Sequence, residues 1–290
     1  MNTADLKLAA RDRFYKRTNR AGGYAILIVV AILVVIPVIW LLLSSLKNDS
    51  DYMAWPIHFL PVDWRWVNYE LTFTMTPFLT VALRTAGIGL VTAVITACTS
   101  AMGGYAFARY QDLKANARLF RIIIVLLIVP YVVFMIPQFM LYSYFHIIPN
   151  TFWPWIFGAL GASPYYIFLY RQFFLGFPKE LEEAAEIDGC GSWRIFWSIL
   201  MPNSRPVIAT VLIFAFNAVW GDYLQPMLFL SNRITLLGVS MATAYQDPHG
   251  NTLRTVSLAA TVIYIIPLIV TFFFGQKYIL KGLITSGLKG

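Results

Sequence analysis

The stretch GFPKELEEAAEIDGCGSWRIFWSILMP, residues 176–202, decides how the rest of the chain is organised. Pro178 suits a first helical turn, and acidic residues follow it where the helix dipole favours anions. The short helix predicted here ends at Gly189 and Gly191, which allow a sharp turn. Ser192 can cap a second helix. The stretch therefore predicts a helix–turn–helix elbow.

The two helices of the elbow differ in character. The second carries an apolar stripe at i, i+3, i+4 and i+7, closed by Pro202 and formed by Trp193, Phe196, Trp197 and Leu200. The first carries five acids, Glu180, Glu182, Glu183, Glu186 and Asp188. Anionic lipid headgroups would repel such a helix, so we expect it to face a protein. Composition alone leaves a solvated loop with a lipid-anchored second helix as the alternative.

Long apolar runs flank the elbow on both sides. Hydrophobic residues make up 59% of the 290 and charged residues only 12%, against roughly 25% charged in soluble domains, which excludes a soluble globular enzyme. About 20 mostly apolar residues cross a membrane, and continuous runs indicate helices rather than a barrel. We expect an all-α membrane protein with six transmembrane helices. The spans are predicted at about 24–44, 80–105, 122–143, 152–170, 207–230 and 256–276.

The net charge of +8 reports orientation rather than nucleic-acid binding. Segments 1–23, 106–121, 171–206 and 277–290 carry 17 Lys and Arg residues, against four in the segments that alternate with them. By the positive-inside rule, the basic N-terminus (1–23), the elbow and the C-terminal tail (277–290) face the cytoplasm, with the transmembrane domain over 24–276. The first span is too long for a signal-peptide core, so we expect it to be retained.

Proline falls in five of the six spans. Each proline removes a backbone hydrogen bond and bends or breaks its helix, and in lipid the freed carbonyl must find another partner. A packed bundle around a central path is therefore favoured, although prolines are also simply commoner in membrane helices. The residues are Pro37, Pro130, Pro137, Pro154, Pro164, Pro226 and Pro267.

The elbow resembles the EAA loop of binding-protein-dependent ABC importer permeases. It has Glu183-Ala184-Ala185, three residues, Gly189, nine residues, Ile199 and Met201-Pro202, with Met201 where leucine is usual. The run from Asn217 to Pro226 resembles a second family stretch, with Gly221 in place of asparagine. The tail from Gly282 to Gly290 is similar to that of the carbohydrate-type subfamily, in particular the maltose-permease G subunits.

This resemblance implies a type I ABC importer permease fold with a cytoplasmic EAA coupling loop, in the plasma (inner) membrane of a prokaryote. It implies four kinds of partner besides membrane lipid: a second homologous permease, a dimer of ATPase subunits, an extracytoplasmic solute-binding protein and a saccharide. The residues implied in ATPase coupling are Glu183, Ala184, Ala185, Gly189, Ile199, Pro202 and Lys289.

The sequence contains no recognisable catalytic motif. There is no Gly-x-x-x-x-Gly-Lys-[Ser/Thr] run to cradle phosphates, so we expect ATP and Mg²⁺ in the partner ATPase and no cofactor in this chain. The histidines, His58, His146 and His249, fall in different outside segments without metal-ligand spacing. We expect a non-catalytic permease subunit.

Polar and aromatic residues inside the spans are candidates for the substrate pathway. Arg84 either snorkels to headgroups or lines the pathway, where it permits an anionic cargo, and Asp222 is expected to face the bundle interior. Asn217, Trp220, Tyr223 and Gln225 add amide and ring surface that suits a sugar, with packing as the alternative for any single ring.

Together these features predict the permease subunit of an ATP-driven, binding-protein-dependent importer for a mono- or oligosaccharide. One alternative is an ion-coupled secondary transporter that uses Asp222. Another is an ABC importer of a non-sugar solute, such as a sugar-phosphate or polyol derivative. A membrane-embedded enzyme is disfavoured because no paired acids or metal ligands face one another.

Overall fold

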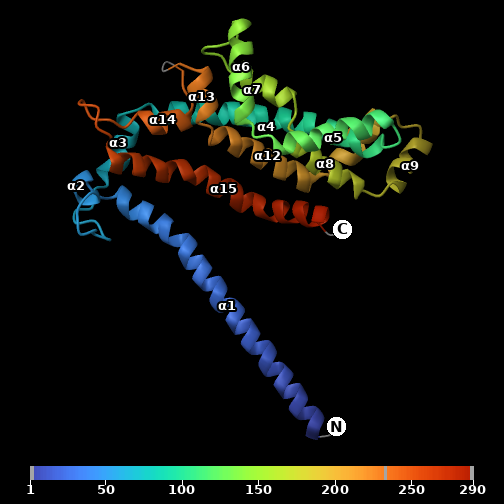
Figure 1. The fold of residues 1–290 in the computed structure, drawn as a ribbon, viewed down its shortest axis with the longest axis horizontal. Coiled ribbons are helices and arrows are strands. Elements are labelled where there is room, and N and C mark those ends of the chain that lie inside the picture. The colour runs from blue at the N-terminus through green and yellow to red at the C-terminus, as the bar shows by residue number, and fades with distance from the viewer. Residues whose placement is uncertain (1–2, 232–233, 288–290) are drawn as a thin grey trace. The chain divides into compact units, whose positions relative to one another are not determined.

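The computed structural model describes the backbone of residues 3–231 and 234–287 and the side chains of residues 22–231 and 234–278. The described residues form a series of helices (Figure 1). In chain order they are α1 (Thr3–Ser45), α2 (Asp49–Tyr52), α3 (Val67–Thr74), α4 (Phe78–Arg109), α5 (Lys114–Ile128), α6 (Val132–Tyr144), α7 (Trp153–Leu160), α8 (Pro164–Leu175), α9 (Glu180–Ile187), α10 (Ser192–Ile195), the π-helix η1 (Phe196–Leu200), α11 (Met201–Asn203), α12 (Arg205–Trp220), α13 (Leu224–Phe229), α14 (Leu237–Thr243) and α15 (Arg254–Gly287). The β pairing in these ranges is one isolated bridge, Gln246 to Thr252. The predicted all-α class is confirmed.

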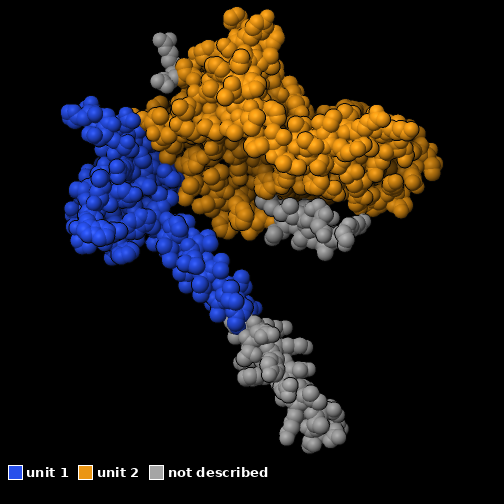
Figure 2. Space-filling model, viewed as in Figure 1, with its two compact units in different colours: residues 1–72, 245–263 blue, residues 73–244, 264–290 orange. Residues whose placement is uncertain are grey.

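The chain divides into two compact units (Figure 2). Unit 1 combines residues 1–72 with 245–263, and unit 2 combines residues 73–244 with 264–290. The boundary falls inside α3 and α15, so both helices contribute to both units.

Unit 1 joins the end of α1 to the polar segment that follows it. Asn68 donates hydrogen bonds to the carbonyls of Ser45 (2.8 Å) and Lys47 (2.7 Å). Asp49 accepts from the backbone and the hydroxyl of Thr255, both at 2.9 Å. The apolar side chains of α1 before this junction are exposed all round, as suits a helix whose solvent is lipid.

Unit 2 is built around α4, which lies beside α8 and α12 (Figure 1). Small residues let these helices approach closely, as is usual between membrane helices. Ala97, Ala101 and Ala108 of α4 are buried in one cluster with Tyr170 and Phe174 of α8. At Gly104 a Cβ atom would stand 2.4 Å from the Cβ of Tyr170, so only glycine fits there.

Three helical stretches are long and apolar enough to cross a membrane: Gly22–Ser45, Phe78–Arg109 and Arg254–Tyr278. They coincide with the predicted spans 24–44, 80–105 and 256–276. Two further helix pairs qualify only when taken together, Lys114–Ile128 with Val132–Tyr144, bent by 104°, and Ser192–Asn203 with Arg205–Trp220, bent by 81°. Within the described ranges this gives up to five spans by length and composition, and the six-span arrangement stays a prediction.

The remaining predicted spans are interrupted. Span 152–170 is divided between α7 and α8 at Gly161, Ala162 and Ser163, and span 207–230 between α12 and α13. Pro130 lies in the break between α5 and α6, where the bend is 104°. Pro154 and Pro164 lie in the first turns of α7 and α8, where a missing N–H removes no bond. The helices continue past three other prolines, Pro37, Pro137 and Pro267.

Candidate functional site

The predicted elbow is present, and its turn has a clear local cause. The helix α9 ends at Ile187 with Asp188 as its C-cap, and Gly189 follows with a φ of +79°, in the left-handed region that glycine adopts without strain. The N–H of Cys190 donates to the carbonyl of Ala185 (2.9 Å), and the N–H of Gly189 to that of Glu186 (3.0 Å). These two bonds form a Schellman motif, which satisfies the last carbonyls of the helix.

The helix α9 has two faces. Glu182 and Ala185 are buried against the rest of unit 2. Glu183 and Ala184 are exposed, as is Ile187, whose exposure reaches 88%. The exposed face therefore combines an acid with an apolar side chain, and α9 lies at the end of unit 2 away from α14 (Figure 1).

An ion pair fixes the buried face. Nε of Arg109, the last residue of α4, donates to both carboxylate oxygens of Glu182, at 2.9 and 2.7 Å, and Nη2 of Arg109 also contacts Oε1. Both side chains are largely buried, at 12% and 9% exposure, where a charge-assisted pair is strong and an unpaired charge is costly. The expectation that all five acids face a partner is therefore wrong for Glu182, because it pairs within the chain.

The second helix of the elbow differs from its prediction in two ways. Its N-cap is Gly191, and Ser192 is already the first helical residue without a side-chain cap bond. The middle of the helix, Phe196–Leu200, is a π-helix, in which wider turns shift the faces. Phe196 and Leu200 are buried as predicted, but Trp193 and Trp197 are 68% and 37% exposed.

The other predicted coupling residues lie around this elbow. Ile199 packs at the edge of the buried cluster, and Pro202 is exposed in α11. Lys289 lies outside the described residues. Glu183, Ala184 and Gly189 thus share one exposed end of the unit with Pro202, while Ala185 and Ile199 support it from beneath.

The predicted pathway residues separate into different places. Trp220 is buried between the rings of Phe216 and Tyr264 and donates its indole N–H to the carbonyl of Tyr264 (3.1 Å). Asn217 accepts from the hydroxyl of Thr271 (3.3 Å). These two residues hold α12 against α15 and line neither of the cavities described below.

The turn between α12 and α13 holds the next two. Asp222 is half-buried, and its carboxylate accepts the backbone N–H of Gln225 (3.2 Å), so it caps the start of α13. Tyr223 is 37% exposed. Asp222 thus has a local structural partner, which fits the expectation that an intramembrane acid is hydrogen-bonded.

Gln225 lines the larger cavity, of about 740 Å³, together with residues of α4, of the bent pair α5–α6 and of α7, α8 and α12. Its side-chain amide donates to the hydroxyl of Tyr131 (2.9 Å), which in turn donates to Gln138 (2.7 Å). Trp155 and Tyr142 add ring surface. Tyr131 and Gln138 were missed in the sequence, although an amide inside an apolar run was a signal for Gln138.

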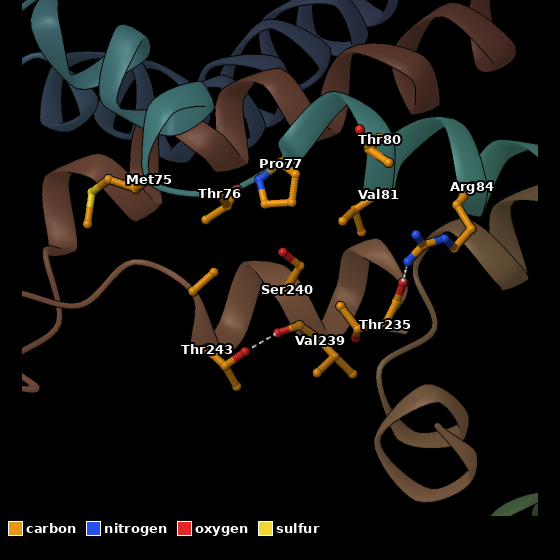
Figure 3. A pocket seen from close by; sticks show the side chains of 11 residues that line it. Met75, Thr76, Pro77, Thr80, Val81, Arg84, Thr235, Val239, Ser240 and Thr243 are labelled. Carbon is orange, nitrogen blue, oxygen red and sulfur yellow. Dashed lines mark hydrogen bonds between the residues drawn. The ribbon is translucent and has the colours of Figure 1, made fainter. Parts of the chain in front are cut away.

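Arg84 lines a second cavity, of about 370 Å³, between the first turns of α4 and the helix α14 (Figure 3). Its guanidinium Nη1 donates to the carbonyl of Thr235 at 3.2 Å. Arg84 therefore lines a cavity, and its place in the substrate pathway stays a prediction. Across the described residues, no three His, Cys, Asp or Glu side chains are grouped as metal ligands.

Comparisons with known proteins agree with this architecture. The family model for "Binding-protein-dependent transport system inner membrane component" matches residues 100–285. The arabinooligosaccharides transport system permease protein of Halalkalibacterium halodurans is 32% identical over 90% of this chain and 93% of its own. The lactose transport system permease protein of Rhizobium radiobacter is 29% identical over 91% and 94%.

A solved structure shares the fold. The crystal structure of a bacterial ABC transporter involved in the import of the acidic polysaccharide alginate covers 91% of this chain and 98% of the compared chain, with a TM-score of 0.72 and 22% sequence identity. Together with the family match, this likeness confirms the predicted type I ABC importer permease fold.

Proposed function

The chain belongs to the family of binding-protein-dependent transport system inner membrane components, and from that premise we propose that it is the permease subunit of an ATP-driven oligosaccharide importer. Relatives named for arabinooligosaccharide and lactose transport support the choice of cargo class. In this proposal the chain crosses the membrane several times with both termini in the cytoplasm, and it carries out no catalysis itself.

The observation that carries the coupling part of the proposal is the two-faced helix α9. Its inner face is anchored to α4 by the Arg109–Glu182 pair, and its outer face presents Glu183 and Ile187. A helix that is anchored on one side and exposed on the other can transmit the movement of a bound partner to the rest of the unit. An acid beside an exposed apolar residue suits a protein partner rather than an anionic membrane surface.

The partners follow from this assignment. A dimer of ATPase subunits would bind ATP and Mg²⁺ and grip the elbows of this chain and of a second, homologous permease. Glu183 would pair with a basic side chain of the ATPase, and Lys289 would form a second contact. An extracytoplasmic binding protein would deliver the saccharide to the other side.

The mechanism requires that a displacement at α9 reach the pathway. Closure of the ATPase pair would move α9, and the ion pair would pass the movement to α4 through Arg109. The helix α4 runs beside α8 and α12 and lines both cavities, so its shift would change their openings together. Helices already broken between α5 and α6 and between α12 and α13 supply places where the path can reshape.

The experiment that tests the proposal is uptake of labelled oligosaccharides by vesicles that contain the assembled importer. We expect Glu183→Lys to abolish ATP-dependent uptake while the chain still inserts and assembles, because the reversed charge repels the basic partner. Asp112→Lys is the matched control, since Asp112 is also an exposed acid in a segment predicted to be cytoplasmic. Equal uptake by the wild type and Glu183→Lys, or uptake driven by an ion gradient without nucleotide, contradicts the proposal.

A backbone variant tests the geometry of the turn separately from the charge of Glu183. Gly189 has a φ of +79°, which the proline ring cannot adopt, so Gly189→Pro should abolish uptake. Gly191 has a φ of −74°, which suits proline, so Gly191→Pro should retain it. If both variants transport equally, the geometry of the elbow is irrelevant to coupling.

A further inference from the structure

The cavity around Arg84 has the features of a built site at the end of unit 2 that carries α14. It is formed by three elements: the first two turns of α4, the residues just before α4, and the helix α14 with the residue Thr235 before it. The volume of about 370 Å³ lies within the range of about 300–1,000 Å³ that small-molecule sites occupy. The close packing of Gly238 on the carbonyl of Asp222, where a Cβ would be 2.3 Å away, fixes α14 as one wall.

Among the described residues that line the cavity, Arg84 is the one charged side chain, and no carboxylate of the described residues pairs with it. Arg84 is partly buried, and among the described residues its only hydrogen bond is the one to the carbonyl of Thr235. A guanidinium has five N–H donors in a planar fork that matches a carboxylate. None of the described lining residues is acidic, so the positive charge is left without compensation on this side.

Neutral hydrogen-bonding groups accompany the charge. Ser240 is 94% buried, and its hydroxyl is directed from α14 into the space between α14 and α4 (Figure 3). No partner for this hydroxyl is found in the described ranges, and the same holds for the hydroxyl of Thr80 on α4. Val81 of α4 and Val239 of α14 add apolar surface to the lining.

We propose that this cavity binds one acidic unit of a saccharide, with its carboxylate on the guanidinium of Arg84, its hydroxyls on Ser240 and Thr80, and its apolar face on the valines. The inference rests on the proposed function and deepens it, because it names an anionic saccharide as cargo. A neutral sugar would leave the partly buried charge uncompensated, whereas a uronate would neutralise it with a bidentate hydrogen bond.

The position of the cavity suits binding of the saccharide when it enters from the outer side of the membrane. Arg84 stands near the predicted outer end of α4, and Arg109 ends the same helix beside α9. At the rise of an α-helix these two residues are about 38 Å apart, so one rigid element connects the proposed saccharide site with the elbow.

The test is direct binding to the complete importer purified in detergent, which needs no ATP hydrolysis. The probes are digalacturonate, its neutral counterpart digalactose, and inorganic sulfate, each measured by calorimetry. We expect digalacturonate to bind at least tenfold more tightly than digalactose, with sulfate a weak competitor. Arg84→Gln should remove this preference, and Arg84→Lys should retain part of it, because lysine keeps the charge but not the fork.

The control is Arg254→Gln, which removes an exposed arginine from a segment also predicted to lie outside; it should bind like the wild type. Thermal unfolding of Arg84→Gln shows whether the variant is folded. Equal binding of the acidic and neutral probes, or an unchanged preference in folded Arg84→Gln, overturns the inference. Sulfate that binds as tightly as digalacturonate also overturns it, because the cavity would then be a general anion site. A defect of Arg84→Gln that is confined to docking of the solute-binding protein overturns it too, because Arg84 would then contact an acidic surface of that protein.

Failure of this inference and failure of the proposed function are distinguishable. If ATP drives uptake of neutral oligosaccharides and digalacturonate shows no preference for Arg84, the importer assignment stands and the anionic cargo does not. If digalacturonate binds through Arg84 and Glu183→Lys leaves transport unchanged, the site stands and the coupling does not.

Discussion

Arg109 and Glu182 show how a single contact can decide the role of an element. They are 73 positions apart in the chain, and their bidentate pair joins α4 to the elbow beside the apolar contacts of Ala185. Five acids follow one another in and after α9, and the pair distinguishes one of them from the rest. With it, one acid becomes an anchor and Glu183 remains exposed for a partner.

We predict that Glu182→Gln lowers the free energy of unfolding by about 3 kcal/mol, because it leaves the buried guanidinium of Arg109 without its counter-charge. Glu180→Gln, at an exposed position of the same helix, should change it by less than about 0.5 kcal/mol. The measurement is thermal unfolding in detergent. Replacing both Arg109 and Glu182 by methionine should recover most of the loss, and a double variant as unstable as the single one contradicts the account.

Asp51 provides a pH-dependent contact in unit 1. Burial disfavours the charged carboxylate, but the N–H of Val62 (3.0 Å) and the ring of His58 (2.7 Å) outweigh it and lower the pKa of Asp51. Since the folded-state pKa is below the unfolded value of about 3.9, the stabilisation is complete above about pH 4 and is lost as the pH falls through the folded-state pKa.

We therefore expect Asp51→Asn to lower the unfolding temperature at pH 6 by about 2–4 °C, the shift that follows from the loss of one hydrogen bond to a charged group. The gap to the wild type should close as the pH falls below 4. Asp63→Asn, at an exposed position of the same segment, should show no gap. A gap for Asp51→Asn that is constant from pH 6 to pH 2.5 is inconsistent with this assignment.

At the scale of elements, the packing of α4 on α8 depends on Gly104. A Cβ there would lie 2.4 Å from Cβ of Tyr170 and 2.9 Å from the backbone nitrogen of Arg171, so no rotamer change can make room. We predict that Gly104→Ala lowers the free energy of unfolding by about 1–3 kcal/mol.

Gly87 offers a matched control on the same helix, because a Cβ there meets nothing within 4 Å. Gly87→Ala should raise the free energy of unfolding by up to about 1 kcal/mol through helix propensity alone. Both variants are compared by thermal unfolding. Equal effects of the two substitutions would mean that α4 and α8 are not packed as closely as the structure has them.

The elements that local chemistry controls were predictable from the sequence. Pro178, the acids after it and Gly189 were sufficient for α9 and its turn, because a Schellman motif is built from neighbouring residues. The π-helix over Phe196–Leu200 was not predictable. A period of 3.6 residues places Trp193 and Trp197 on the buried stripe, and only the packing of Phe196 and Leu200 against α4 and α8 shifts the faces.

Longer-range features required the structure. The sequence offered pathway and packing as readings of Trp220, and its bond to Tyr264 shows a packing contact. The contact of Arg84 with Thr235 joins residues 151 positions apart. The spacing of residues along the chain does not predict such distant pairs. The alternation of apolar and basic segments, in contrast, was sufficient to predict a helical membrane protein.

At the scale of the whole molecule, the two proposed sites lie at opposite ends of unit 2 and are joined by α4. One end presents the exposed face of α9, and the other holds the cavity of Arg84 between α4 and α14 (Figures 1 and 3). In the proposed mechanism the chain is a passive gate, in which force applied at the elbow changes the cavities that α4 lines. This mechanism requires that an ATPase subunit cover the exposed face of α9.

The most direct test is the accessibility of position 187, which is 88% exposed in this chain. A single cysteine is placed there by Ile187→Cys in a chain whose own cysteines are removed by Cys98→Ala and Cys190→Ser, and its labelling by a charged maleimide is followed with and without the ATPase subunits. The account predicts that assembly slows labelling at least tenfold, while Asp112→Cys in the same background is labelled at an unchanged rate. Equal labelling of position 187 in the free chain and in the assembled importer would contradict it.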